Sequence, residues 1–133
     1  MLWDPIYSVN VKEIDDQHKQ FIALMNHVYD VYESMETEKQ MEDMFHRLNE
    51  HAQFHFATEE LYFEKFHYEG AQEHVKIHHA IIDKIADFKR RYEEEGYAHV
   101  MIELIDFLEE WLTHHIVKYD KQYTRCFNEH GLY

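Results

Sequence analysis

Glycine and proline are scarce in this chain, with only three glycines and one proline among 133 residues. An all-β fold needs many tight turns, and these two residues are the ones that most often form them. Their scarcity favours long helices. A single domain over residues 1–133 is expected, because this length is enough to bury one core of ordinary size. Apolar residues make up 45% of the chain, which argues against disorder.

The charge balance excludes one class of partner. The formal net charge is -14, and the only basic cluster is Lys89-Arg90-Arg91. Phosphate binding requires clustered basic residues, so no nucleic-acid partner is expected. No stretch approaches the roughly 20 apolar residues that span a bilayer, and no membrane insertion is expected. Cys126 is the single cysteine, and the N-terminus lacks the pattern of a secretory signal, so we expect a cytoplasmic location.

Apolar residues recur at three- and four-residue spacing in four stretches, which is typical of amphipathic helices. The first stretch follows an irregular N-terminal segment and continues to about Ser34. Asp15 and Asp16 carry side-chain oxygens suited to capping a helix, so the first helix is expected to begin there. The second stretch continues to about Phe66, and Thr37 is its expected N-cap.

The remaining two stretches complete the predicted architecture. The third begins at Ala71 and continues to Gly96, where glycine favours a helix end. The fourth begins at Val100 and continues to about His115. Four amphipathic helices joined by short loops predict an all-α, up-down-up-down four-helix bundle, here with an N-terminal extended arm.

Metal-ligating side chains interrupt the predicted apolar stripes. His55 and Glu59 are four residues apart, as are His74 and His78. Such pairs lie one turn apart on a helix, so each pair offers two donor atoms to one region. His18 lies on the predicted inward face of the first helix. Any one of these histidines alone suits a surface or core position, but buried together without a ligand they would be costly.

His115 and Asp120 are harder to place. His115 is at the inward end of the fourth helix, and Asp120 follows five residues later. On an ideal α-helix this spacing separates them by about 140°. The two share a face only if the helix bends or the carboxylate reaches across.

The number and type of donors indicate the kind of metal site. Five imidazoles and two carboxylates are too many for one tetrahedral zinc ion and too rich in nitrogen for calcium or magnesium. Two transition-metal ions fit better. If both carboxylates and a hydroxide bridge the ions, the histidines divide as three and two. One ion then keeps a vacant position for a small diatomic ligand.

Together these residues resemble a known family. From Trp3 to about Cys126 the chain is similar to bacterial members of the hemerythrin family, the non-haem di-iron oxygen carriers. The resemblance rests on Ile14-Asp15-Asp16-Gln17-His18-Lys19, on the H-x-x-x-E of His55 and Glu59, on the H-x-x-x-H of His74 and His78, and on His115-Ile116 followed by Asp120.

The resemblance implies a cofactor and a ligand set. The cofactor is two iron ions, Fe2+ or Fe3+, with a bridging hydroxide or oxide. The implied metal ligands are His18, His55, Glu59, His74, His78, His115 and Asp120. By the resemblance, the coordinatively full iron is held by His74, His78 and His115. The iron with the open position is held by His18 and His55, with the two carboxylates as bridges.

The resemblance also implies an apolar oxygen pocket next to these ligands. Its implied residues are Phe21, Phe56, Trp111, Leu112 and Ile116. The same five residues also suit an ordinary core, and the two roles are compatible. His51, His79 and His114 adjoin implied ligands but fall outside the family motif, so we interpret them as supporting or surface residues. Asn10 and His67 stand where similar chains often have glycine.

The function implied by the resemblance is reversible oxygen binding for transport, storage or delivery. Oxygen would be held as peroxide at the five-coordinate iron, and no enzymatic role is expected. The alternatives are a di-iron redox enzyme (a peroxidase, an NO reductase or an oxygen scavenger), an oxygen sensor and an iron-storage module. The expected partners are O2 and an oxygen-consuming enzyme as recipient. A monomer is favoured, although the family includes oligomers.

Overall fold

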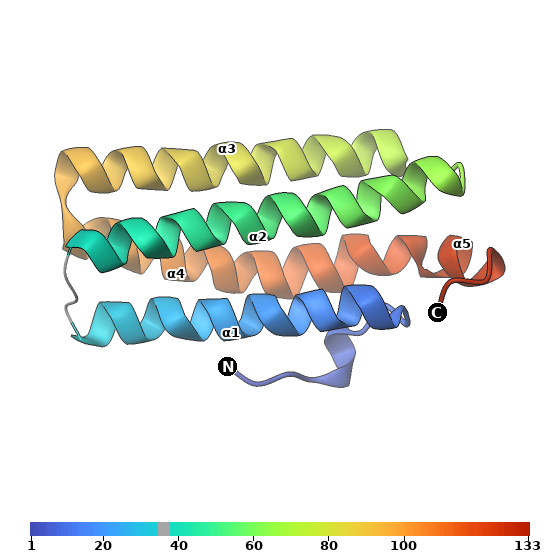
Figure 1. Ribbon diagram of the computed structural model, residues 1–133, viewed down its shortest axis with the longest axis horizontal. Helices are drawn as coiled ribbons and strands as arrows, with labels where there is room; N and C mark the ends of the chain where they lie inside the picture. Colours follow the sequence, from blue (N-terminus) through green and yellow to red (C-terminus); the bar gives the residue numbers. More distant parts are fainter. Residues whose placement is uncertain (35–37) are drawn as a thin grey trace.

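Four long helices form an antiparallel bundle in the computed structural model, which describes residues 1–34 and 38–133. Consecutive helices run in opposite directions along the long axis of the molecule (Figure 1). The predicted up-down-up-down four-helix bundle is therefore confirmed. The helices are α1 (Lys12–Ser34), α2 (Glu38–Lys65), α3 (Ala71–Glu95) and α4 (Tyr97–Trp111).

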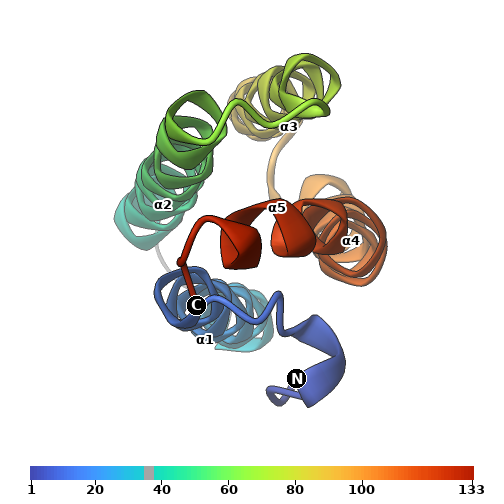
Figure 2. The ribbon, with the colours of Figure 1, turned by 90° about the vertical axis from the view of Figure 1, so that its right-hand side faces the viewer.

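Four shorter elements complete the chain. One 3-10 turn, η1 (Pro5–Tyr7), lies in the N-terminal arm. A π-helix, η2 (Leu112–Tyr119), continues α4, and a 3-10 turn, η3 (Asp120–Tyr123), follows it. The last helix, α5 (Thr124–Glu129), lies across the end of the bundle between α1, α2 and α4 (Figure 2). None of the helices in the described ranges is long and apolar enough to cross a membrane.

The first helix begins earlier than predicted, at Lys12 rather than at Asp15 and Asp16. The Asp15 carboxylate still accepts hydrogen bonds, but from the incoming arm: the Val9 N–H donates to it at 2.8 Å and the Ser8 hydroxyl at 2.6 Å. The prediction was wrong because this carboxylate binds residues before the helix instead of the first free N–H groups of the helix itself.

The end of the third helix agrees with the prediction. Gly96 has a φ of +89°, which side chains disfavour, and its N–H donates to the Tyr92 carbonyl at 3.0 Å. The break between α2 and α3 contains His67, whose φ is +51°, and Asn10 before α1 has a φ of +57°. Both therefore adopt a conformation that glycine accepts without strain. The predicted N-cap Thr37 lies outside the described residues.

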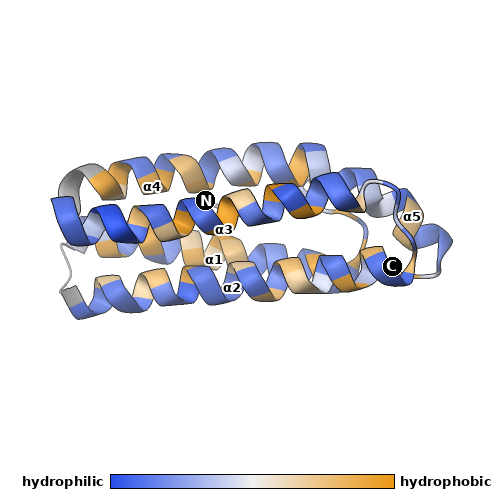
Figure 3. Ribbon diagram, turned by 90° about the horizontal axis from the view of Figure 1, so that it is seen from above, coloured by the Kyte–Doolittle hydropathy of each residue, from blue (hydrophilic) through white to orange (hydrophobic). Residues whose placement is uncertain are grey.

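Two apolar clusters fill the bundle. Each long helix carries both hydrophobic and hydrophilic residues along its length (Figure 3). The larger cluster draws on all four long helices and includes Met25, Met44, Phe88 and Leu104. The smaller one, which we call the end cluster, consists of Val9, Val11, Ile14, Phe63, Phe66, Tyr123 and Phe127. The end cluster packs α5 and the N-terminal arm onto the bundle.

Candidate metal centre

The seven predicted ligands come together inside the bundle, and each long helix or its continuation supplies at least one of them. All seven are buried, with at most 3% of any residue exposed. They are His18 on α1, His55 and Glu59 on α2, His74 and His78 on α3, His115 on η2 and Asp120 at the start of η3.

The donors form two groups, and within each group the candidate ligand atoms lie within 4.8 Å of one another. We call them the three-histidine group (Glu59, His74, His78 and His115) and the two-histidine group (His18, His55 and Asp120). The division into three and two imidazoles, expected from counting the donors, is thus visible in their positions.

Each carboxylate faces imidazoles of both groups. One Asp120 oxygen, Oδ1, lies 3.0 Å from His74 Nε2 and 2.9 Å from His115 Nε2, whereas Oδ2 lies 3.2 Å from His18 Nε2. Glu59 Oε1 lies 3.0 Å from His78 Nε2 and 3.4 Å from the corresponding atom of His55. Both carboxylates therefore stand where a group shared between two ions would be.

The π-helix explains the five-residue spacing between His115 and Asp120. The Asp120 N–H donates to the His115 carbonyl, an i to i+5 hydrogen bond. This pattern places residues five apart one turn above each other, whereas an α-helix does so for residues four apart. Both side chains consequently point into the bundle without a sharp bend.

The unsatisfied polar atoms of the centre provide a test of whether a metal fits. The Nε2 atoms of all five histidines and all four carboxylate oxygens are shielded from solvent and have no hydrogen-bond partner of acceptable geometry among the described residues. Each such buried group costs on the order of 1–3 kcal/mol. Nitrogen and oxygen donors in this proportion suit transition-metal ions, and coordination would satisfy all of them at once.

Side chains outside the donor set orient two of the imidazoles. Gln17 Oε1 lies 2.7 Å from His55 Nδ1, and Gln17 itself is buried and donates from Nε2 to the Thr58 hydroxyl at 3.1 Å. Glu60 Oε2 lies 3.0 Å from His78 Nδ1. In both pairs the acceptor oxygen fixes the proton on Nδ1, so the Nε2 lone pair faces the centre.

Electrostatics favour the cation-binding protonation state of three ligands, His55, His78 and Asp120, and oppose it for Glu59. Burial holds the pKa of His55 well below its usual range and lowers that of His78 to about 4, although Glu60 opposes the latter shift. Burial and the Asp120 charge raise the pKa of Glu59 to about 8. Burial opposes ionisation of Asp120 too, but His115 and its neighbours hold the pKa of Asp120 well below its usual range.

Apolar rings enclose the three-histidine group. The Phe56 ring stacks on His78 with a centroid distance of 3.9 Å and an interplanar angle of 9°. Phe63, from the end cluster, contacts His74 edge-on at 5.0 Å. The centre therefore lies between the two apolar clusters of the bundle, and its ligands are buried. Phe56, Glu60 and His78 also line a surface pocket between α2 and α3.

The five residues expected to form an apolar pocket are all buried. Three of them, Phe21, Phe56 and Trp111, line a small internal cavity together with His55. Leu112 and Ile116 are completely buried in the larger cluster, but they are absent from the lining of this cavity. The three histidines outside the motif differ from one another, since His51 lines the cavity whereas His79 and His114 are exposed.

Sequence reasoning missed three residues around the centre: Gln17, Glu60 and Tyr123. Tyr123 is completely buried, and burial together with the Glu59 and Asp120 charges raises its pKa well above its usual value. Its position three residues after Asp120 was a usable signal. Gln17 and Glu60 directly adjoin predicted ligands, but their contacts depend on how the helices pack.

Comparisons with known proteins agree with this fold and centre. Residues 9–126 match the family described as "Hemerythrin HHE cation binding domain". Bacteriohemerythrin of Clostridium acetobutylicum is 25% identical over 128 residues, which cover 92% of this chain and 97% of the relative. Bacteriohemerythrin of Methylococcus capsulatus is 28% identical, and the match covers 92% of each chain.

A solved structure gives the same result for the fold. A crystal structure of wild-type hemerythrin superposes with a TM-score of 0.81 and 26% identity, covering 95% of this chain and 96% of the other. The fold and the buried donors define a helical-bundle protein with a metal centre. More particularly, the chain belongs to the hemerythrin family.

Proposed function

We propose that this chain binds molecular oxygen reversibly at two iron ions held by the seven buried ligands. The observation that carries this proposal is the arrangement of the donors: a three-histidine group, a two-histidine group and two carboxylates that face both. Family membership supports the choice of iron and of oxygen. When bound, the iron pair would supply the electrons for the reversible reduction of oxygen.

In this proposal the residues of the chain position the two ions, orient the imidazoles and shield the centre from water. The three-histidine group would hold one ion with three imidazoles, and Glu59 and Asp120 would face both ions. The two-histidine group offers one imidazole fewer, and the internal cavity lies on its side because His55 lines it. Gln17 holds the His55 ring in place. Phe21, Phe56, Trp111, Leu112 and Ile116 exclude water, which opposes irreversible oxidation.

A redox enzyme at the same centre is the second candidate from sequence, but the described residues give it less support. The unsatisfied polar atoms around the donor set belong mainly to the seven ligands themselves. The cavity beside His55 is lined by apolar side chains and histidine rings. Apart from the imidazoles of His51 and His55, its described lining supplies no group that could act as acid or base toward a bound substrate.

Reversibility is the decisive measurement. The iron-loaded protein is reduced without oxygen, oxygen is admitted and the visible spectrum is followed. A charge-transfer band that appears with oxygen and vanishes under vacuum, over several cycles, is the expected result. Immediate and irreversible conversion to the diferric form would contradict a carrier and favour the redox enzyme. Metal analysis is expected to give two irons per chain.

A further inference from the structure

The internal cavity beside the two-histidine group has few exits. Its volume is about 10 Å³. This is the lower limit for holding one small molecule. Nine of its eleven described lining residues are buried, and the other two, His51 and Phe107, are partly exposed. Phe56 also lines a surface pocket between α2 and α3, but its ring is buried and stacks on His78 at 3.9 Å. The short paths into the cavity that require the least displacement of packed rings therefore lead past His51 or Phe107.

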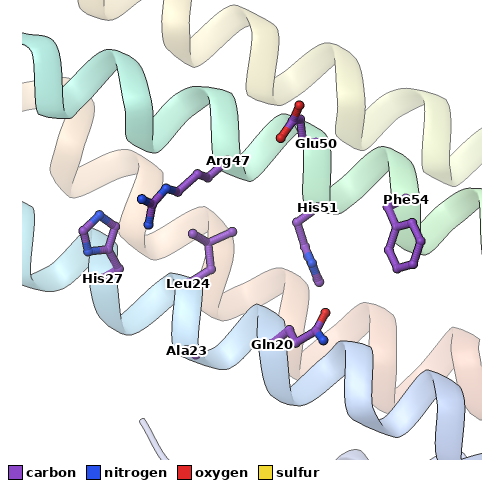
Figure 4. A pocket seen from close by; sticks show the side chains of 8 residues that line it. All are labelled: Gln20, Ala23, Leu24, His27, Arg47, Glu50, His51 and Phe54. Atoms are coloured by element: carbon purple, nitrogen blue, oxygen red, sulfur yellow. The ribbon is translucent and has the colours of Figure 1, made fainter.

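A surface groove lies next to this cavity. It lies between α1 and α2, has a volume of about 600 Å³, and is lined by residues that include Gln20, Leu24, Arg47 and Phe54. Figure 4 shows these side chains around the seam between the two helices. His51 is the residue that lines both the groove and the cavity.

The His51 side chain lines the groove on one side and the cavity on the other. In Figure 4 its side chain extends from α2 across the seam toward α1, near Gln20. The ring lies parallel to that of His55, with an interplanar angle of 3° and a centroid distance of 6.2 Å, and stacks beside Phe21 at 6.1 Å. Its Nε2 is shielded and has no hydrogen-bond partner among the described residues, so moving the ring breaks no hydrogen bond at that atom.

Phe107, the other partly exposed lining residue, is held more firmly. Its ring contacts Phe88 at 5.5 Å and packs against the larger apolar cluster. Displacing it would expose apolar surface of that cluster, which is unfavourable. Rotating His51, a partly exposed imidazole that borders an open groove, exposes less apolar surface, at the cost of the hydrogen bond between its ring and the Gln17 backbone.

We propose that His51 is the gate through which small neutral molecules pass between the α1–α2 groove and the cavity next to the two-histidine group. The proposal rests on the proposed function, since the molecule admitted there is O2. Ions and water gain little behind the gate because the cavity is lined by apolar side chains and histidine rings. His51 is thus a positioning residue for access and takes no part in holding the metal.

The first test compares rate constants for oxygen association and dissociation in the iron-loaded protein. Removing a gate speeds passage in both directions, so His51→Ala should raise both rate constants by about threefold or more. The equilibrium constant should stay within about twofold, because both rates change by a similar factor. His114→Ala, which removes an exposed histidine next to a predicted ligand and away from the groove and the cavity, is the matched control and should change neither rate.

Two outcomes of this test would overturn the proposal. One is that His51→Ala leaves both rates unchanged while Phe107→Ala raises them, which would place the passage on the α4 side. The other is a changed equilibrium constant with only one altered rate, which would mean that His51 acts on the bound ligand. His51→Trp, which enlarges the ring, is expected to slow both rates.

A second readout does not depend on reversible oxygenation. Trp111 lines the cavity, so quenching of its fluorescence by dissolved oxygen reports access to that space. The measurement uses zinc-loaded protein, because zinc has no redox chemistry, and a Trp3→Phe background that leaves one tryptophan. His51→Ala should raise the quenching rate constant, and an unchanged value would refute the gate. If wild-type protein fails to bind oxygen reversibly, only the proposed function fails, and this comparison still decides the gate.

Discussion

The three-histidine group and the two-histidine group differ in what surrounds them. Aromatic rings pack directly on the three-histidine group, with Phe56 3.9 Å from the His78 ring and Phe63 5.0 Å from the His74 ring. On the other side, His55 borders an internal cavity. An open surface pocket lined by Phe56, Glu60 and His78 lies beside the three-histidine group, whereas the space beside the two-histidine group is an enclosed cavity. The two donor groups therefore have different surroundings within one bundle.

Removing a carboxylate that faces both groups is expected to have the largest effect, because it disturbs metal binding by both groups. Glu59→Ala removes the oxygen that lies within 3.4 Å of imidazoles from both groups. We expect the metal content to fall from about two ions per chain to fewer than one. Metal analysis after gel filtration measures it. Glu60→Ala, at the adjacent position, is the control and should retain most of the metal; equal loss in both variants would count against a shared carboxylate at Glu59.

Leu112→Ala tests the shielding of the centre. Leu112 is completely buried, so its truncation should lower the free energy of unfolding by about 2–5 kcal/mol. It should also admit water and speed oxidation of the oxygenated protein without removing iron. Urea unfolding and decay of the visible band measure the two effects. Ile102→Ala, at an exposed position on α4, should change neither.

The two effects of Leu112→Ala separate its two possible roles. A loss of stability with an unchanged oxidation rate would show that Leu112 is an ordinary core residue. Its absence from the lining of the internal cavity makes this a demanding test.

The hydrogen-bond partners of His55 and His78 also differ between the two groups. Gln17, which orients His55, is buried, whereas 34% of the Glu60 side chain, which orients His78, is exposed. Gln17→Ala should weaken metal binding by about 10–100-fold, the usual cost of losing such a partner. Glu60→Ala should cost less because water can replace the lost oxygen. Chelator competition measures both affinities, and a greater loss from Glu60→Ala would reverse the interpretation.

The pH dependence of the free energy of unfolding, in the metal-free protein, is expected to be a smaller effect. The pKa of Glu59 is about 8 in the folded chain, above its unfolded value of about 4.5, so folded protein binds more protons between these limits. His55 and His78 have lowered pKa values and act in the opposite direction below about pH 6.5. The free energy of unfolding should therefore fall as the pH rises from about 6.5 to 8.

Glu59→Gln provides the matched control for this dependence. The amide does not titrate, so the decline in the free energy of unfolding should become shallower in this variant. The raised pKa of His115 leaves a small residual slope in the same direction. Urea titrations of metal-free protein at several pH values measure it. An identical slope in both proteins would show that Glu59 is already ionised near neutral pH.

Much of the fold was predictable because it depends on local pattern. Apolar spacing located the four helices, and Gly96 ended the third as expected, with a positive φ. The start of α1 was missed because the Asp15 carboxylate binds Val9 and Ser8 of the arm. Capping rules consider only the helix, whereas here a tertiary contact competes for the same oxygen atoms.

Part of the candidate centre was likewise predictable from local spacing, and the rest depended on tertiary structure. Spacing alone paired His55 with Glu59 and His74 with His78. It failed for His115 and Asp120, because an α-helix was assumed where the chain forms the π-helix η2. The role of His51 was likewise hidden, since it depends on a groove between α1 and α2 that no single helix contains.

The contact between His18 and Asp120 has a consequence for folding. These residues are about a hundred positions apart in sequence, yet their side chains lie 3.2 Å apart, on α1 and η3. A metal ion held by both would close a loop of nearly the whole chain, much as a disulfide does in a secreted protein. Metal loading should thus act as a covalent-like cross-link, slowing global unfolding and protecting amide hydrogens far from the centre against exchange.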